Sequence, residues 1–184
     1  MKTFLLLVLT FMLPTIYMQN NGKAALSPTD TETEYVYTAN SHTYRIWIER
    51  ITDSLYVLHH ETEGKELSSW ELPYPVYRFC CGNLTGDRTP EIAVGVIKPT
   101  RYFKDSAKRL FLFKLYHGKL IRPLWLGSRV GYPLEDFRIE PPAPEDSLNS
   151  DLLHIHTIER KHDGTLVEAI YRYGGFGLKF KHYL

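Results

Sequence analysis

Short segments in which apolar and polar residues alternate are the feature that most constrains the fold of this chain. Residues 43–51 (TYRIWIERI) alternate throughout, and such segments recur from Tyr35 to the C-terminus. A β-strand places successive side chains on opposite faces, so this period of two is typical of half-buried strands. The one helical candidate, Tyr102–Arg109, is too short to form a stable helix.

The predicted strands are short and evenly spaced. Residues that favour a positive φ angle separate several of them, as at His117-Gly118 and Asp163-Gly164. Many short strands without intervening helices predict an all-β chain of antiparallel sheets. The predicted strands are Thr43–Ile51, Ser54–His60, Glu66–Leu72, Val76–Cys81, Glu91–Ile97, Arg109–Tyr116, Lys119–Leu126, Leu134–Ile139, Leu152–Glu159, Leu166–Tyr173 and Leu178–Tyr183.

An internal repeat links three parts of this pattern. Leu55–Leu72, Leu110–Leu126 and Leu153–Tyr171 each combine an alternating strand, a turn with glycine and a second strand. Trp70 and Trp125 occupy matching places in the first two. Chance similarity between hairpins is the alternative, because alternation makes all strands resemble one another. A true repeat predicts about three units, each a small sheet that packs on the next.

A second recurrence precedes the later two units. Tyr77–Phe79 comes before a turn-rich loop and then Glu91–Ala93, and Phe137–Ile139 comes before a proline-rich loop and then Asp151–Leu153. Each predicted unit is therefore a sheet of three or four strands.

The N-terminus predicts export. Lys2 precedes an apolar run over residues 4–13, which is the pattern of a secretory signal, and Pro14 interrupts it. A cleaved signal and an uncleaved membrane anchor are both open, because residues 23–25 (Lys-Ala-Ala) lack the usual outer small residue of a cleavage site. We therefore expect residues 1–25 to be a signal peptide or N-terminal anchor, 26–33 a linker, and 34–184 a single β-rich domain. The expected location is the periplasm, the cell surface or the medium.

The net charge, the cysteines and the absence of common motifs argue against several classes of function. The formal net charge of +1 argues against a nucleic-acid protein held by phosphate neutralisation. Cys80 and Cys81 are adjacent, so on a strand they point to opposite faces and are poorly placed to form a disulfide or a zinc site. The common nucleotide, hydrolase and metalloprotease motifs are absent from the sequence.

One segment carries a recognisable motif. Residues 82–95 (GNLTGDRTPEIAVG) resemble the G-D-x-N-G-D-G-x-P-D-[LI]-x-[VI]-G segment of FG-GAP repeats, which build integrin α-type β-propellers. The likeness extends loosely over residues 77–126. It implies propeller-blade-like repeats, and about three of them are too few to close a ring. We therefore expect an incomplete or open propeller, or stacked sheets.

The resemblance also implies a calcium site. Loops of this family often bind Ca²⁺, which takes oxygen ligands from alternate loop positions. The matching positions here are Asn83, Thr85, Asp87, Glu91 and the carbonyl of Thr89. Only two of them are carboxylates, so the expected affinity is weak. The alternative is a metal-free turn in which Asn83 and Asp87 cap backbone amides.

Two further sets of residues were weighed for chemistry. His154 and His156 share one face of a strand, but no neighbouring ligand motif joins them, and we expect them to face solvent. Scattered carboxylates could form a glycosidase-like pair only if the fold brought two together. The carboxylates considered were Glu49, Glu71, Glu135 and Asp136.

These observations favour an exported, non-enzymatic β-repeat module that binds a protein or glycan partner at the cell envelope. The alternatives are an envelope carbohydrate hydrolase with an unrecognised carboxylate pair, and a structural accessory subunit. Nucleic acid is not expected as a partner, and membrane contact is expected only through an uncleaved N-terminal segment.

Overall fold

The computed structural model describes residues 33–87, 89–127, 130–142 and 152–184. All described residues lie in one compact unit. The predicted signal segment and linker, apart from Thr33, lie outside the described residues. Within the described ranges, no helix has the length and apolarity needed to cross a bilayer.

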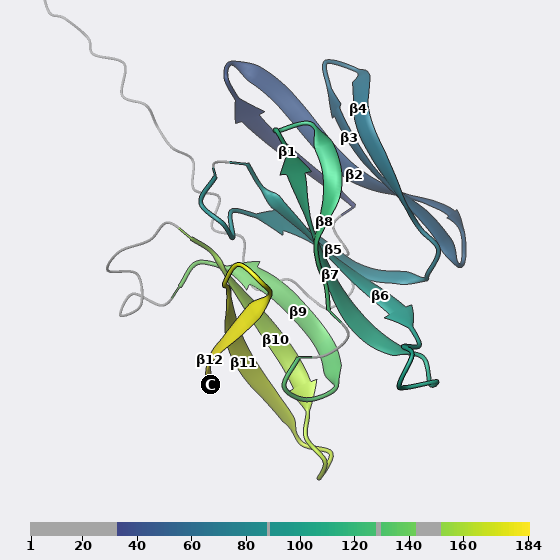
Figure 1. The fold of residues 1–184 in the computed structure, drawn as a ribbon, viewed down its shortest axis with the longest axis vertical. Helices are drawn as coiled ribbons and strands as arrows, with labels where there is room; N and C mark the ends of the chain where they lie inside the picture. Colours follow the sequence, from purple (N-terminus) through teal and green to yellow (C-terminus); the bar gives the residue numbers. More distant parts are fainter. Residues whose placement is uncertain (1–32, 88, 128–129, 143–151) are drawn as a thin grey trace, which may run out of the picture. The chain divides into compact units, whose positions relative to one another are not determined.

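Twelve strands and no helix make up the regular structure of the described residues (Figure 1). They form three antiparallel sheets of four strands each, with consecutive strands as neighbours. Their bounds are β1 Glu34–Ala39, β2 His42–Thr52, β3 Leu55–Thr62, β4 Lys65–Leu72, β5 Val76–Gly82, β6 Glu91–Lys98, β7 Ala107–Tyr116, β8 Leu120–Leu126, β9 Leu134–Glu140, β10 His154–Arg160, β11 Leu166–Tyr173 and β12 Leu178–Tyr183. The prediction of an all-β chain with about three blade-like sheet units, open rather than closed, is confirmed.

The sheets are meanders, β1-β2-β3-β4, β5-β6-β7-β8 and β9-β10-β11-β12. Two-residue turns close two hairpins of the first sheet with both central residues at positive φ, at Asn40-Ser41 (50° and 65°) and Glu63-Gly64 (51° and 74°). Turns of this hand match the twist of the flanking strands, which keeps the first meander in register.

The predicted repeat is correct in number but shifted in its third copy. Leu55–Leu72 and Leu110–Leu126 are the third and fourth strands of their sheets, whereas Leu153–Tyr171 covers the second and third strands of the last sheet. The strand β1 was also absent from the predicted set. Both errors follow from alternation, which marks a strand without saying which strand of the sheet it is.

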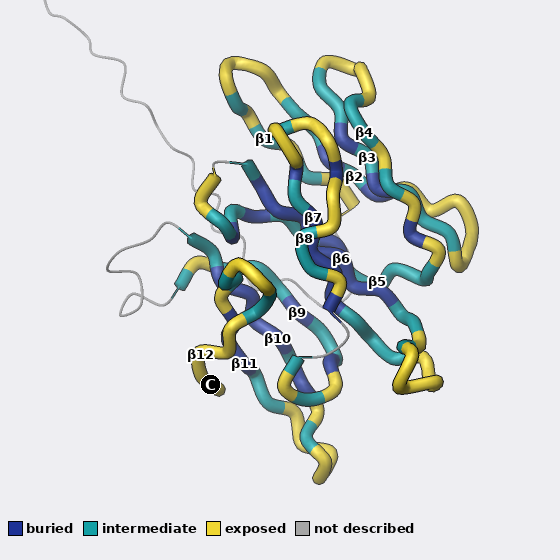
Figure 2. Tube along the Cα trace, in the orientation of Figure 1, coloured by how far each residue is buried: buried dark blue, intermediate teal, exposed yellow. Residues whose placement is uncertain are grey.

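The middle sheet is covered on both faces. One buried cluster joins Ile46 and Leu58 of the first sheet to Val94 and Phe113 of the second. Another joins Leu112 of the second sheet to Ile155 of the third. For this reason the central strand β6 is buried continuously from Glu91 to Val96 and appears dark in Figure 2. The three sheets therefore form a stack in which each end sheet has one face outside the shared clusters. The members of the first cluster are Ile46, Ile48, Leu58, Leu72, Phe79, Ile92, Val94, Val96, Phe111, Phe113, Leu115 and Ile121.

The two cysteines also lie on opposite faces of the second sheet. Both are thiols rather than members of a disulfide. Cys81 packs against the first cluster and Cys80 against the second. The prediction that they point to opposite faces is confirmed.

Polar contacts fasten the sheets to each other. Between the first and second sheets, the Nδ1 atom of buried His60 lies 2.9 Å from the carbonyl oxygen of Lys119, and the amide of Ile121 donates to Oγ of Ser68 at 3.1 Å. Between the second and third sheets, Nε of Arg78 donates to Oδ1 of Asp136 at 2.9 Å. These contacts fix the register of the stack.

Candidate functional site

The loop that resembles an FG-GAP motif is organised around Glu91. This side chain is fully buried at the start of β6. Its carboxylate accepts hydrogen bonds from the amides of Leu84 and Thr85, at 2.7 and 3.1 Å, and from the hydroxyl of Thr85 at 2.6 Å. Burial raises the pKa of Glu91, and these hydrogen bonds oppose that rise. The Glu91 carboxylate therefore holds the loop in place by accepting hydrogen bonds from the backbone of the loop.

Two other predicted calcium ligands, Asn83 and Asp87, accept hydrogen bonds from the loop. Oδ1 of Asn83 accepts the amide of Gly86 at 2.8 Å, and Oδ1 of Asp87 accepts the amide and hydroxyl of Thr89 at 3.0 and 2.6 Å. These are the amide caps of the metal-free alternative. Among the described residues, no group of three or more His, Cys, Asp or Glu side chains is placed to hold a metal ion. The weak calcium site over residues 83–91 stays a prediction, and an ion there would have to displace these hydrogen bonds.

The loop braces the second sheet against the third. Leu84 is buried in the cluster that joins these sheets, and the carbonyl oxygen of Asn83 accepts the amide of Leu153 at 2.8 Å. A Cβ atom added at Gly82 would lie 2.6 Å from Leu153 and 2.8 Å from Ile139. The glycine that opens the motif therefore permits close packing of the two sheets.

A second buried carboxylate, in the third sheet, also accepts several hydrogen bonds. Glu159 on β10 is fully buried and accepts hydrogen bonds from the amide of Tyr132, the hydroxyl of Thr157 and the hydroxyl of Tyr171, at 2.6, 2.7 and 2.8 Å. Glu159 is not among the site residues predicted from the sequence. The sequence pattern could have predicted that Glu159 is buried. It lies at the next inward-facing position after Ile155 and Thr157 on the same strand.

Three of the four carboxylates proposed for hydrolysis contact basic side chains. Glu135 binds Nε of Arg160 at 2.7 Å and lies 3.5 Å from Nζ of Lys108. Asp136 binds Arg78 across the junction of two sheets. Glu49 lies beside His59, and Glu71 is exposed on β4. Cationic neighbours hold the pKa of Glu135 below its ordinary value, with the hydrogen bond from Arg160 as the main cause.

The two histidines on β10 are buried, contrary to the expectation that they face solvent. His154 is 3% exposed and His156 is 7% exposed. Nδ1 of His156 lies 2.9 Å from Oε1 of Glu168 on the neighbouring strand β11. The carboxylate of Glu168 accounts for the buried imidazole of His156. Alternation in the sequence does not reveal such a partner on the next strand.

The strongest candidate site lies on the outer face of the first sheet. Trp47 on β2 stacks on His59 of β3, with ring centroids 4.7 Å apart and planes 12° from parallel. The guanidinium of Arg45 lies 4.5 Å from the centroid of the Trp47 ring. Their strand neighbours Ile46 and Leu58 point the other way, into the core. Trp47, Arg45 and His59 therefore form a row across the face that lies outside the first core cluster.

Carboxylates border this row on all four strands. Arg45 lies 2.9 Å from Glu34 of β1 and 3.5 Å from Glu61 of β3. His59 lies 2.7 Å from Glu66 of β4 and 3.2 Å from Glu49 of β2. We call this set the outer-face ladder. Its members are Glu34, Arg45, Trp47, Glu49, His59, Glu61 and Glu66.

The first two sheets differ sharply in charge. Residues 33–75 contain seven Asp or Glu and three Lys or Arg, whereas residues 76–126 contain three Asp or Glu and ten Lys or Arg. The overall charge near zero conceals this division. Separate partners of opposite charge would be attracted to the two sheets.

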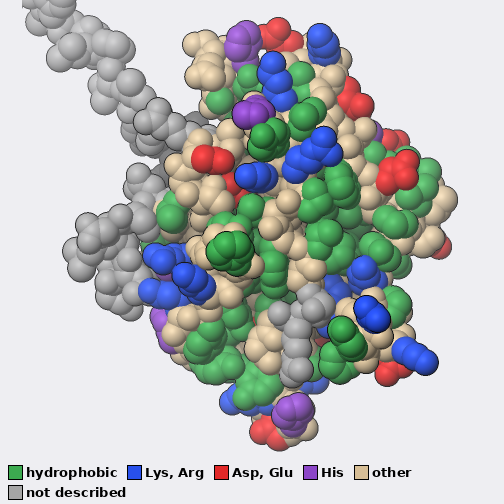
Figure 3. Space-filling view, in the orientation of Figure 1, with side chains coloured by type: hydrophobic (Ala, Val, Ile, Leu, Met, Phe, Trp, Pro, Cys, Tyr) green, Lys and Arg blue, Asp and Glu red, His purple; other side chains and the backbone are tan. Residues whose placement is uncertain are grey.

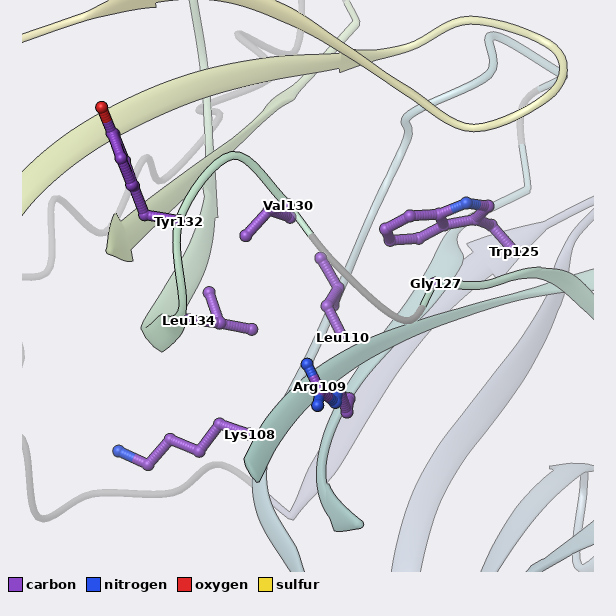
Figure 4. A pocket seen from close by; sticks show the side chains of 8 residues that line it. All are labelled: Lys108, Arg109, Leu110, Trp125, Gly127, Val130, Tyr132 and Leu134. Carbon is purple, nitrogen blue, oxygen red and sulfur yellow. The ribbon is translucent and has the colours of Figure 1, made fainter. Parts of the chain in front are cut away.

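A hollow between β7, β8 and the segment before β9 was also considered (Figure 4). It is partly open to solvent, has a volume of about 10 Å³, and has no carboxylate among its described lining residues. The amine of Lys108 at its edge already donates to the carbonyl oxygen of Glu135 at 2.7 Å. The described lining of the hollow therefore holds no carboxylate pair for hydrolysis. Its lining residues are Lys108, Arg109, Leu110, Trp125, Gly127, Val130, Tyr132 and Leu134.

No protein-family model, curated protein or solved structure matches the chain. The likeness of residues 82–95 to FG-GAP repeats therefore remains a resemblance of sequence. Function has to be argued from the surfaces of the molecule.

Proposed function

We propose that the chain is a non-enzymatic binding module of the cell envelope and that the outer-face ladder of its first sheet contacts a protein partner. The observation that carries this proposal is the arrangement of Arg45, Trp47 and His59 on a sheet face outside the core cluster. Tryptophan and arginine are the residues that most often dominate the energy of protein interfaces.

The contacts within the ladder support a preorganised surface. An ion pair with Glu34 holds Arg45, and a hydrogen bond and stacking hold His59, so little side-chain entropy remains to be lost on binding. Arg45, Glu34, Glu49 and Glu66 keep roughly half of their side-chain surface exposed. A charged, flat sheet face suits a protein surface better than a small ligand, which needs a concave site.

The acidic excess of the first sheet indicates the chemistry of the partner. Seven acidic residues against three basic ones would attract a basic protein surface and would orient it during approach. Binding driven in this way weakens as salt screens the charges. A glycan partner remains the alternative, and it would show little dependence on salt.

Affinity capture from envelope extracts with the full-length chain tests this proposal. We expect a specific protein to be retained by the wild type, released by added salt, and reduced at least about tenfold in amount by Trp47→Ala. Tyr116→Ala is the matched control, because Tyr116 is an exposed ring on the second sheet, away from the ladder. Equal capture by the two variants, or no specific capture at all, would overturn the proposal.

A further inference from the structure

The hairpin between β6 and β7 presents two aromatic rings to solvent. Its tip is a defined turn, in which the amide of Thr100 donates to the carbonyl oxygen of Phe103 at 2.8 Å and the amide of Phe103 donates to Oγ1 of Thr100 at 3.1 Å. Tyr102 is 83% exposed and Phe103 is 55% exposed. Adjacent exposed rings at a hairpin tip are costly in water and indicate a contact site.

Basic residues flank these rings in the sequence, and the guanidinium of Arg101 lies 5.9 Å from the centroid of the Tyr102 ring. Residues 98–109 contain five Lys or Arg and one acidic residue, Asp105. Lys98 is held by Tyr74 at 3.1 Å, and Lys108 by the Glu135 carbonyl at 2.7 Å. Arg101 and Lys104 are exposed on the tip itself. At the place of this hairpin, Figure 3 shows Lys and Arg side chains beside hydrophobic ones.

The chemistry of this tip fits a lipid–water interface. Aromatic rings settle at the level of the headgroups, and Lys or Arg side chains beside them reach anionic phosphates. A convex tip of two rings is too small to form the buried centre of a stable protein interface. The excess of basic residues over the whole second sheet would attract an anionic surface from a distance.

We propose that the β6–β7 hairpin docks the protein on an anionic membrane surface, with Tyr102 and Phe103 at headgroup depth and Arg101 and Lys104 on lipid phosphates. This contact is separate from the outer-face ladder, which is on another sheet. A protein bound to lipid through one surface and to a partner through the other would hold that partner at the membrane.

Lipid photo-crosslinking with the full-length chain tests the hairpin directly. A benzophenone amino acid replaces Tyr102, and the protein is illuminated with vesicles of phosphatidylcholine, with or without phosphatidylglycerol. Because the readout is local, membrane attachment through the N-terminal segment does not mask it. The matched control carries the photoreactive residue at Tyr116, at the opposite end of β7 and 46% exposed.

We expect lipid adducts at position 102 that increase with phosphatidylglycerol and few adducts at position 116. The double variant Arg101→Glu and Lys104→Glu should lower the yield at position 102 by at least about tenfold, since each basic residue contributes to attraction by anionic lipid. Equal yields at both positions, or a yield indifferent to phosphatidylglycerol, would overturn the proposal. Adducts to protein rather than lipid in native envelope membranes would also overturn it. Trp47→Ala should leave the lipid adducts unchanged, which separates this proposal from that of the ladder.

Discussion

The hydroxyl of Tyr37 lies 3.0 Å from Nε2 of His60, at the buried junction of the first and second sheets. The other ring nitrogen of His60 donates to the carbonyl oxygen of Lys119, because a carbonyl can only accept. In the neutral ring Nε2 is then an acceptor, and the hydroxyl of Tyr37 donates to it. Burial at this junction lowers the pKa of His60 and so favours its uncharged form.

This arrangement predicts loss of stability in mild acid. Burial lowers the pKa of His60, so the unfolded chain binds the proton more readily than the folded one. The stability that depends on neutral His60 is present above its unfolded pKa of about 6.5 and is lost as the pH falls towards the lower folded pKa. We expect the free energy of unfolding, measured with urea, to fall between about pH 7 and pH 5. His60→Gln should make that fall smaller, and an unchanged fall would contradict the assignment.

Glu91 should be a major determinant of stability. Glu91→Ala removes the acceptor of three hydrogen bonds. It leaves the buried amide of Leu84 without its partner. We expect a loss of about 3 kcal/mol in the free energy of unfolding. The control Asp87→Ala removes an exposed cap from the same loop and should cost about 1 kcal/mol or less. Similar losses in the two variants would show that Glu91 is not the centre of the loop.

Calcium binding by residues 83–91 can be tested separately. If the predicted weak site forms, millimolar Ca²⁺ should raise the melting temperature of the full-length chain relative to EDTA, because ligands that bind the native state stabilise it. Asp87→Ala should abolish the rise. No shift with calcium would contradict the prediction and leave the loop as a hydrogen-bonded brace between two sheets.

The ion pair of Arg78 with Asp136 should stabilise the contact of the second and third sheets. Both side chains are largely buried, at 19% and 28% exposed, and the hydrogen bond to Asp136 raises the pKa of Arg78. Removal of one partner from a half-buried pair is expected to cost about 1–3 kcal/mol. Asp136→Ala should thus lower the urea midpoint more than Asp53→Ala, which breaks an exposed pair with Arg50. Equal effects would mean that the pair does not join the sheets.

Much of the fold could be predicted from the sequence because alternation reports burial directly. The strands β11 and β12 have the predicted bounds, and Cys80 and Cys81 face opposite clusters as expected. The order of strands within a sheet could not be read, and the third copy of the repeat was therefore shifted by one strand. Alternation carries no information about pairing partners.

The candidate site could not be predicted for a related reason. Alternation placed Arg45, Trp47 and His59 on one side of their strands, but it could not show which side the next sheet covers. Ion pairs such as that of His59 with Glu66 depend on the register of two strands, which is set by the turn at Glu63-Gly64 and a bulge after His60. Contacts between strands appear only in the folded sheet.

Site-specific photo-crosslinking in the cell tests the role of the outer face most directly. A benzophenone amino acid at Val36, which is 53% exposed on β1 and pairs with Arg45, would report a protein seated on the ladder. Leu166, 56% exposed on the third sheet, provides the matched position. The account predicts one discrete protein adduct at position 36, lost with Trp47→Ala and absent at position 166. No adduct at position 36, or the same adduct at both positions, would contradict it.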